Sequence, residues 1–379
     1  MRTIAFLTGS RGEWGYIRPI LRLIDGSPDL EYQLIATNMH LLPQFGTSAN
    51  EIERDGFRMS ERIYMTYDGY TAATMTKSLA SLLLELPTCL QRLRPDILVL
   101  AGDRGEQLMG AITGLHLNIP VAHIQAGELS GNIDGIIRHG ITKLAHIHFA
   151  ANEEFAERVR QMGEEPFRVF TTGAPLVDEI ANGTYTSAVE LENKYRLNLR
   201  EPLVLAVQHP VTEEEAFADD QVELTIEALL DVNWSTVFIF PNADAGSEAI
   251  RTRLAQLKRP NIRLFRNLPR QDYLGIMRVA RVMVGNSSSG IMEAPTVGTP
   301  AVNIGRRQNG RPQGTNVLNV NHDKTEIVEA IHLAASPEFQ ERALTTINPY
   351  GDGRASERIV QVLKTIEIDE KLLNKEMTY

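Results

Sequence analysis

Short apolar runs alternate with longer amphipathic segments along most of the chain. Runs of strand length lie at residues 3–8, 32–36, 97–101, 121–124, 146–151 and 169–171. Segments of helix length with one apolar face lie between several of these runs, at residues 71–92, 106–117 and 153–162. The alternation predicts parallel strands joined by crossover helices, which is the arrangement of an open α/β sheet.

The same rhythm restarts in the second half of the chain, after a polar and weakly patterned stretch at residues 182–201. Strand-like runs follow at residues 203–207, 236–240, 262–265, 282–284, 301–304 and 317–320. We therefore predict two doubly wound, Rossmann-like α/β domains, residues 1–180 and 181–353, that face a central cleft. The C-terminal helical segment, residues 354–379, is expected to pack back on the first domain.

Composition narrows the class of protein. The formal net charge of −10 argues against a nonspecific nucleic-acid binder, because such proteins present a basic face. The single cysteine, Cys89, excludes an intrachain disulfide and fits a reducing compartment. The first apolar run is too short for a signal-peptide core, and Glu85 ends the longest one. We therefore expect a cytoplasmic protein without a membrane span.

Charged and amide side chains gather where two neighbouring strands of the first half end. Asp103 and Arg104 follow the run at 97–101, and Gln125, Glu128 and Asn132 follow the run at 121–124. The carboxyl ends of parallel strands form the ligand-binding edge of such a sheet. The loop at 125–134 therefore predicts an active site, although Asp103 can equally be the N-cap of the next helix.

Three acids of this edge, Asp103, Glu128 and Asp134, are expected to converge on one pocket. Crowded carboxylates have pKa values that separate into acid and base roles. Arg138 and His139 follow Asp134 at the start of a helical pattern and suit contact with an anion.

The second half has its own candidates at strand ends. His209 follows its first strand, and the segment Val284-Gly-Asn-Ser-Ser-Ser-Gly-Ile-Met-Glu293 follows a later one. Small residues and hydroxyls there, including Ser287 and Ser288, predict a diphosphate site, with Glu293 placed to accept from ribose hydroxyls. A Ser/Asn helix cap with an exposed Glu is the alternative.

Two further loops carry arginines beside glycines. Residues 8–13 follow the first strand, and their glycines allow backbone N–H groups to approach a phosphate that Arg11 neutralises. A simple tight turn is the alternative. The loop at 305–311 contains Arg306, Arg307 and Arg311, and in an acidic chain we interpret it as an anion pocket rather than a solvated basic loop.

In combination these motifs resemble the hydrolysing UDP-N-acetylglucosamine 2-epimerases. The resemblance rests on HIQAGELSGNID, IRHGITKLAH, AGDR, QHPVT, PNADAGS, GNSSSG and GRRQNGR, and extends from TGSRGEWG to NPYGDGRASERI. It implies a GT-B-like fold and conversion of UDP-N-acetylglucosamine plus water to N-acetylmannosamine and UDP, for sialic-acid-type sugar biosynthesis. The nucleotide-binding residues of the family match here at Arg11, His209, Ser287, Ser288, Glu293 and Arg307, and we add Arg104, Arg138 and His139 as substrate contacts. Its catalytic acids match at Asp103 and Asp134.

Gln125 departs from the pattern of the family, in which many members have a catalytic Glu at this position. An amide cannot accept a proton as a carboxylate does. Either Glu128 takes that role, or Gln125 only orients substrate, or activity is reduced.

The implied reaction eliminates UDP to give 2-acetamidoglucal and then adds water, without a metal or nicotinamide cofactor. We expect a homodimer or homotetramer. Alternative substrates are UDP-diacetylbacillosamine and a GDP-linked sugar. A GT-B glycosyltransferase and a non-catalytic nucleotide-sugar sensor remain as alternatives from other classes.

Overall fold

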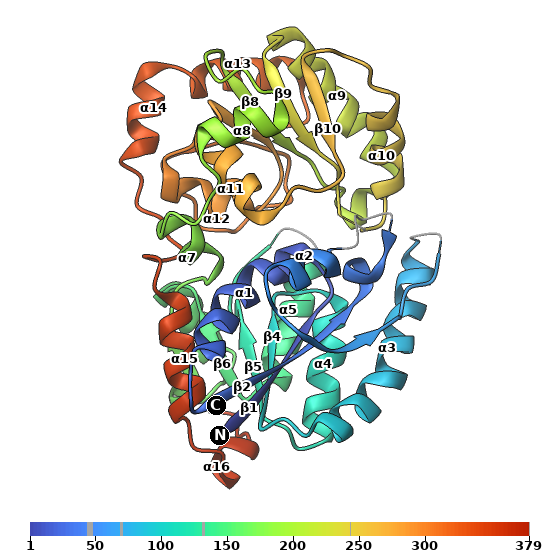
Figure 1. Ribbon diagram of the computed structural model, residues 1–379, viewed down its shortest axis with the longest axis vertical. Coiled ribbons are helices and arrows are strands. Elements are labelled where there is room, and N and C mark those ends of the chain that lie inside the picture. Colours follow the sequence, from blue (N-terminus) through green and yellow to red (C-terminus); the bar gives the residue numbers. More distant parts are fainter. Residues whose placement is uncertain (44–47, 69–70, 131–132, 243, 379) are drawn as a thin grey trace. The chain divides into compact units, whose positions relative to one another are not determined.

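The chain forms two compact units, each built on its own parallel β-sheet (Figure 1). The computed structural model describes residues 1–378 except 44–47, 69–70, 131–132 and 243. The first unit comprises Met1–Leu129, Ile133–Asp178 and Tyr350–Tyr379, and the second contains Glu179–Pro349. Asn132, one of the polar residues noted in the sequence, lies outside the described residues.

The first unit contains a seven-stranded sheet with the order β3-β2-β1-β4-β5-β6-β7. All neighbouring strands are parallel. The strands are β1 (Arg2–Thr8), β2 (Leu30–Thr37), β3 (Met59–Ile63), β4 (Ile97–Ala101), β5 (Val121–Ile124), β6 (Ile147–Ala150) and β7 (Val169–Thr171). The order reverses between β1 and β4, which is the switch point where ligands bind in doubly wound sheets.

Helices cover both faces of this sheet. On one face α3 (Ala72–Leu93), α4 (Gly105–His116) and α5 (Ile133–Leu144) lie side by side over Ala5 and Leu7 of β1. Successive side chains of a strand point to opposite faces, so Ile4 and Phe6 are buried on the other face, where α1 (Arg11–Asp25) contacts α15 (Ala355–Thr365). Burial on both faces explains why β4 and β5 are continuous apolar runs.

The second unit repeats this plan with a six-stranded parallel sheet of order β10-β9-β8-β11-β12-β13. Its strands are β8 (Leu203–Val207), β9 (Ser235–Ile239), β10 (Ile262–Phe265), β11 (Val282–Gly285), β12 (Ala301–Ile304) and β13 (Val317–Val320). One buried cluster lies under α9 (Ala218–Val232), α10 (Ser247–Gln256) and α13 (Lys324–Ala334), and another under α8 (Ala188–Tyr195) and α11 (Arg270–Val279). Here the order reverses between β8 and β11.

The predicted doubly wound α/β class is confirmed in both units. The hydrophobic pattern missed strand β3 and helix α8, among other elements. Strand β3 buries fully only Ile63, so its sequence has no apolar run. Helix α8 lies in the stretch interpreted as unpatterned and buries only Leu191.

The remaining helices are shorter or peripheral: α2 (Ala49–Arg54), α6 (Glu153–Gln161), α7 (Leu176–Ala181), α12 (Ser289–Met292), α14 (Pro337–Leu344) and α16 (Glu370–Leu373). Across the described part of the chain, no helix combines the length and apolar character needed to cross a membrane.

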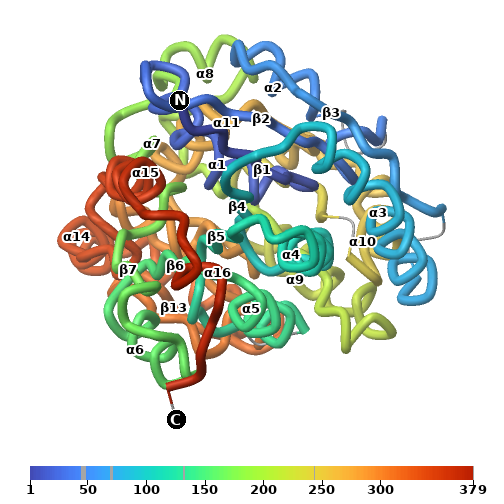
Figure 2. The backbone as a smooth tube through the Cα atoms, turned by 90° about the horizontal axis from the view of Figure 1, so that it is seen from below, coloured from blue at the N-terminus to red at the C-terminus, as the bar shows by residue number. Residues whose placement is uncertain are grey.

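The C-terminal segment belongs to the first unit (Figure 2). The side chains of Arg168 and Lys375 hold it there. The buried guanidinium of Arg168 donates to the carbonyl oxygens of Lys371 and Leu372 at 2.6 Å and of Asn374 at 3.1 Å. The ammonium of Lys375 donates to the carbonyls of Ala145 (2.6 Å) and Lys143 (2.9 Å), at the C-terminal end of α5. A cation at this end of a helix satisfies carbonyls that have no partner within the helix.

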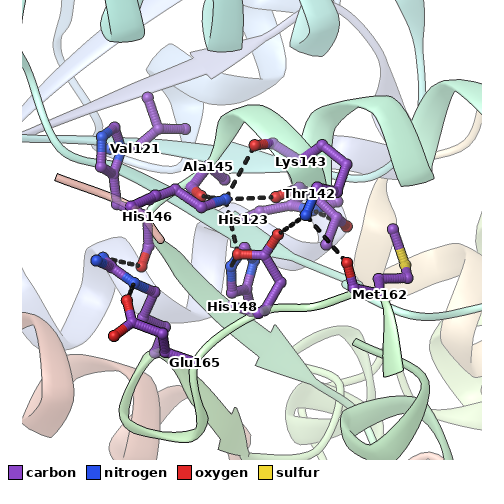
Figure 3. Close-up of polar contacts among 12 residues, drawn as sticks. Val121, His123, Thr142, Lys143, Ala145, His146, His148, Met162 and Glu165 are labelled. Carbon is purple, nitrogen blue, oxygen red and sulfur yellow. Dashed lines mark hydrogen bonds and ion pairs between the residues drawn. The ribbon is translucent and has the colours of Figure 1, made fainter. Parts of the chain in front are cut away.

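Lys375 also belongs to a buried ionic cluster around Glu164. Figure 3 shows the polar contacts in this region, among them those of Thr142, Lys143, Ala145 and His148. Glu164 accepts from Lys143 at 2.8 Å and from His148 at 3.0 Å, and lies 2.7 Å from Lys375. Burial alone would raise the pKa of Glu164, but the hydrogen bonds from His148, Lys143 and Lys375 hold that pKa at about 2. The carboxylate is therefore ionised and tied to three donors.

Replacing Glu164 with glutamine is expected to destabilise the first unit, because it leaves the Lys375 ammonium buried without its counter-ion. Removal of one partner from a buried ion pair costs roughly 3–5 kcal/mol, so the melting temperature should fall by roughly 6–10 °C. Glu157→Gln, which breaks an exposed pair with Arg160 on α6, is the matched control and should shift melting by less than about 2 °C. Equal melting temperatures for the two variants would contradict a stabilising role of the ionic cluster around Glu164.

Candidate functional site

The candidate acids of the first unit lie at the carboxyl ends of β4 and β5 and at the start of α5. Asp103 follows β4, Glu128 follows β5, and Asp134 lies in the first turn of α5. Because β1, β4 and β5 are adjacent and parallel, the loops that follow them lie at one edge of the sheet.

Arg138 connects these loops from α5. Its fully buried guanidinium donates through Nη2 to the Asp103 carboxylate and through Nη1 to the carbonyl oxygen of Glu128 at 2.9 Å. Asp134 is four residues before Arg138, so the two share one face of the helix. The structure therefore places Arg138 as the link between two of the predicted acids and the helix that carries the third.

Gln125 contacts Glu128 within the tight turn after β5. Its Nε2 donates to Glu128 Oε2 at 3.0 Å, and both side chains are buried. The backbone of Gln125 is left-handed, with φ of +72°, which is a strained conformation for a residue with a β-carbon. Gln125 is thus held beside the nearest carboxylate.

His139 lies next to Arg138 on α5 and is half-buried. Burial, together with the charges of Arg138 and Arg158, lowers the pKa of His139. Its imidazole is therefore neutral at neutral pH, which weakens the expectation that it contacts an anion as a cation.

The loop after β1 forms a capping box around Glu13. The N–H groups of Gly9 and Ser10 donate to the carboxyl oxygen Oε2 of Glu13 at 2.5 and 3.1 Å, and the Ser10 hydroxyl accepts from the Glu13 N–H. This is a capping box at the start of α1, so these two N–H groups already have an acceptor within the chain. Arg11 remains at this edge as a half-buried cation.

In the second unit, His209 and the turn after β11 are joined by Asn286. The Asn286 side chain accepts from the His209 N–H at 2.7 Å and donates to the His209 carbonyl at 2.8 Å. His209 Nδ1 accepts from the Asn242 N–H at 3.1 Å, which leaves the proton of a neutral imidazole on Nε2. Gly285 allows the turn after β11 to approach the end of β8 closely, because a β-carbon at this position would lie 2.1 Å from the Val207 carbonyl oxygen.

The serines of this turn contact one another and the loop after β12. The hydroxyls of Ser287 and Ser289 are 2.9 Å apart, and Ser288 is the N-cap of the short helix α12. Arg307 donates to the Asn286 carbonyl at 3.3 Å. Of the other two arginines in that loop, Arg306 pairs with Glu214, and Arg311 donates to the sulfur of Met292 at 3.0 Å.

Glu293 follows α12 and is buried rather than exposed, contrary to the helix-cap alternative. Its carboxylate accepts from Arg270 of α11, a residue that sequence reasoning missed. Arg270 lies twenty-three residues earlier in the chain, and no local spacing connects the two.

Among the described residues, no group of three His, Cys, Asp or Glu side chains is arranged to hold a metal ion.

Residues 22–364 match the family model of UDP-N-acetylglucosamine 2-epimerase. The chain belongs to this family. A hydrolysing UDP-N,N'-diacetylbacillosamine 2-epimerase of Legionella pneumophila is 34% identical over 376 residues, which is 99% of each chain. A UDP-N-acetylglucosamine 2-epimerase of Neisseria meningitidis is 33% identical over 97% of this chain and 96% of its own length.

The fold agrees with that of solved structures in the family. The crystal structure of UDP-GlcNAc 2-epimerase from Neisseria meningitidis bound to UDP-GlcNAc superposes with a TM-score of 0.82 at 18% identity, covering 96% of this chain and 99% of that one. The GT-B-like architecture expected from the sequence is therefore confirmed.

Two further carboxyl groups of the first unit, those of Glu13 and Glu106, are buried together. Neither was among the site residues predicted from the sequence. Both side chains flank Gly9, where a β-carbon would lie 3.0 Å from Glu106 Oε1. Burial, and then the charge of Glu106, raise the pKa of Glu13 to about 8. Glu13 is therefore protonated at neutral pH. The Ser-x-x-Glu spacing of a capping box, here Ser10 and Glu13, is the sequence signal that could have pointed to Glu13.

The titration of Glu13 predicts a pH-dependent effect of Glu13→Gln. Because its folded pKa lies above its unfolded pKa, ionisation of Glu13 removes stability as pH rises from about 4.5 to 8. Glutamine keeps an acceptor for Gly9 and Ser10 but does not ionise. The melting temperature of Glu13→Gln relative to wild type should therefore increase between pH 5 and pH 8.

The exposed substitution Glu31→Gln controls for a general charge effect and should show no such trend. A pH-independent difference between Glu13→Gln and wild type would contradict the buried acid pair.

Proposed function

We propose that the chain is a hydrolysing nucleotide-sugar 2-epimerase that converts UDP-N-acetylglucosamine and water to N-acetylmannosamine and UDP. The main support is the connection of Asp103, Glu128 and the Asp134 helix through buried Arg138, in a chain of this family. Several carboxyl groups at one sheet edge suit removal and return of a proton at carbon.

The first step is an elimination. A carboxylate takes the C2 proton, the C2–H electron pair forms a C1–C2 double bond, and the C1–O electron pair leaves with UDP. The product is 2-acetamidoglucal. Water then adds its hydroxyl at C1 while C2 receives a proton on the opposite face, which gives the manno sugar.

We assign acid and base roles to Asp103 and Asp134, with Glu128 as the carboxylate that replaces the Glu expected at position 125. Gln125 then orients Glu128 through its 3.0 Å hydrogen bond. In this hydrogen-bonded pair only the carboxylate of Glu128 can transfer a proton, and the amide of Gln125 fixes its orientation.

We assign the nucleotide to the second unit. In this assignment His209 donates from Nε2 to a diphosphate oxygen, since its Nδ1 already accepts a hydrogen bond. Ser287 and Ser288, in the turn after β11, and Arg307, which donates to the Asn286 carbonyl, contact the same group. Glu293 accepts from the ribose hydroxyls. Arg11, Arg104 and His139 are assigned as additional contacts of the substrate, and Arg138 acts through Asp103.

We further propose a cytoplasmic homodimer or homotetramer that supplies N-acetylmannosamine for sialic-acid-type sugars. Buried, unpaired Cys89 fits a reducing compartment. A second candidate substrate is UDP-diacetylbacillosamine, since the Legionella relative at 34% identity is named for it.

The test is NMR analysis of products from a panel of UDP-N-acetylglucosamine, UDP-diacetylbacillosamine and their GDP-linked counterparts. The proposal predicts free UDP and free N-acetylmannosamine from the first compound alone, without an acceptor. A reversible nucleotide-linked product would contradict hydrolysis. An acceptor requirement would indicate a glycosyltransferase, and tight UDP binding without turnover would indicate a sensor.

Asp103→Asn and Asp134→Asn are expected to lower kcat by about a hundredfold or more, because an amide cannot transfer the proton. The Kd for UDP, measured by calorimetry, should change by less than about threefold if nucleotide binding lies in the second unit. Asp25→Asn, at the exposed end of α1, is the control and should change neither value. A parallel loss of UDP affinity would show that these aspartates hold the nucleotide instead.

A further inference from the structure

Helix α11 presents two side chains to the turn after β11. Arg270 and Tyr273 are three residues apart and share one face of the helix. Arg270 donates to Glu293, and the Tyr273 hydroxyl forms a hydrogen bond with the Ser289 hydroxyl. The first turn of α11 therefore supports both the serine turn and the carboxylate that follows it.

Arg270 lies between two buried carboxylates from distant parts of the second unit. Its Nη2 contacts Glu293 Oε1, and its Nε lies 3.3 Å from Oε2 of Glu179. The side-chain exposures of Arg270, Glu179 and Glu293 are 13%, 5% and 7%. One guanidinium thus holds two carboxylates that cannot be solvated well by water.

The charge of Arg270 matters for the protonation of Glu293. Burial raises the pKa of Glu293, while the charge and hydrogen bond of Arg270 oppose that rise and the charge of Glu179 adds to it. Without Arg270, two buried carboxylates would face each other, and Glu293 would take up a proton. Its ability to act as a strong acceptor therefore depends on Arg270.

We propose that Arg270 is a positioning residue for nucleotide recognition, which holds the Glu293 carboxylate as the acceptor for the ribose hydroxyls. This inference rests on the proposed assignment of Glu293 to the ribose. A carboxylate has acceptor positions on both oxygens, so the contact that Arg270 makes through Oε1 is compatible with a second contact to a hydroxyl. The recognised group is the vicinal diol of a ribonucleotide.

The experiment compares the affinities of UDP and 2′-deoxy-UDP, measured by calorimetry, for the wild type and Arg270→Gln. The ratio of the two Kd values isolates the hydroxyl contact, because the diphosphate and the base are common to both ligands. For the wild type we expect UDP to bind about tenfold tighter or more, as for loss of one hydrogen bond to a charged acceptor. For Arg270→Gln the ratio should fall below about threefold at pH 6.5.

The pH dependence of the ratio separates positioning from general damage. In Arg270→Gln, Glu293 ionises only as pH rises, so the preference for UDP should partly recover at pH 8.5. In the wild type, where the charge and hydrogen bond of Arg270 lower the pKa of Glu293, the ratio should change less between these pH values. Glu293→Gln should lose the preference at both pH values, and Arg270→Gln should add no further loss in that background.

Arg278→Gln is the matched control, since Arg278 is exposed near the other end of the same helix and stacks on Tyr185 at 5.1 Å. It should keep the wild-type ratio. If Arg270→Gln does not fold, Arg270→Lys retains the charge without the forked geometry and should give an intermediate ratio.

A wild-type preference that survives in Arg270→Gln at both pH values would overturn the inference and leave the proposed function intact. A wild type that binds UDP without preferring it over 2′-deoxy-UDP would also overturn it, because Glu293 would then not contact the ribose 2′-hydroxyl. A wild type that does not bind UDP at all would instead contradict the proposed function.

Discussion

The fully buried guanidinium of Arg138 is the interaction on which the first unit's functional edge depends. It joins the loop after β4, through Asp103, to the loop after β5, through the Glu128 carbonyl. A buried cation must be paired, so these contacts bring the loops and α5 into one arrangement. At the C-terminal end of α5, Lys375 contacts the terminal carbonyls, so a cation from a distant part of the chain also holds this helix.

The second unit uses the same device in Arg270, which holds Glu179 and Glu293 next to the serine turn. In both units the parallel sheet has a switch point, and a buried arginine pairs with at least one carboxylate in the loops beside it. We interpret the first carboxylate set as the sugar chemistry and the second as nucleotide recognition. Under the proposed function, one set handles the proton at sugar C2 and the other binds the nucleotide.

Hydrophobic pattern was enough to predict both parallel sheets, because central strands such as β4 and β8 are buried on both faces. It missed β3, where only Ile63 is fully buried. Strand-end chemistry located the loops around Asp103 and Gly285. The ion pairs within those loops were not predictable, because Asp103–Arg138 and Arg270–Glu293 join residues far apart in sequence. The Ser10-x-x-Glu13 spacing of a capping box is visible in the sequence, but we interpreted this segment as a phosphate-binding loop.

The central claim is that carboxylates of the first unit remove and return a proton at C2 of the sugar. Incorporation of deuterium at that carbon tests this claim most directly. The wild type is incubated with UDP-N-acetylglucosamine in D₂O and the released sugar is examined by ¹H NMR and mass spectrometry. Elimination and readdition predict N-acetylmannosamine with one deuterium on C2. A released sugar that retains its original C2 hydrogen would contradict the account.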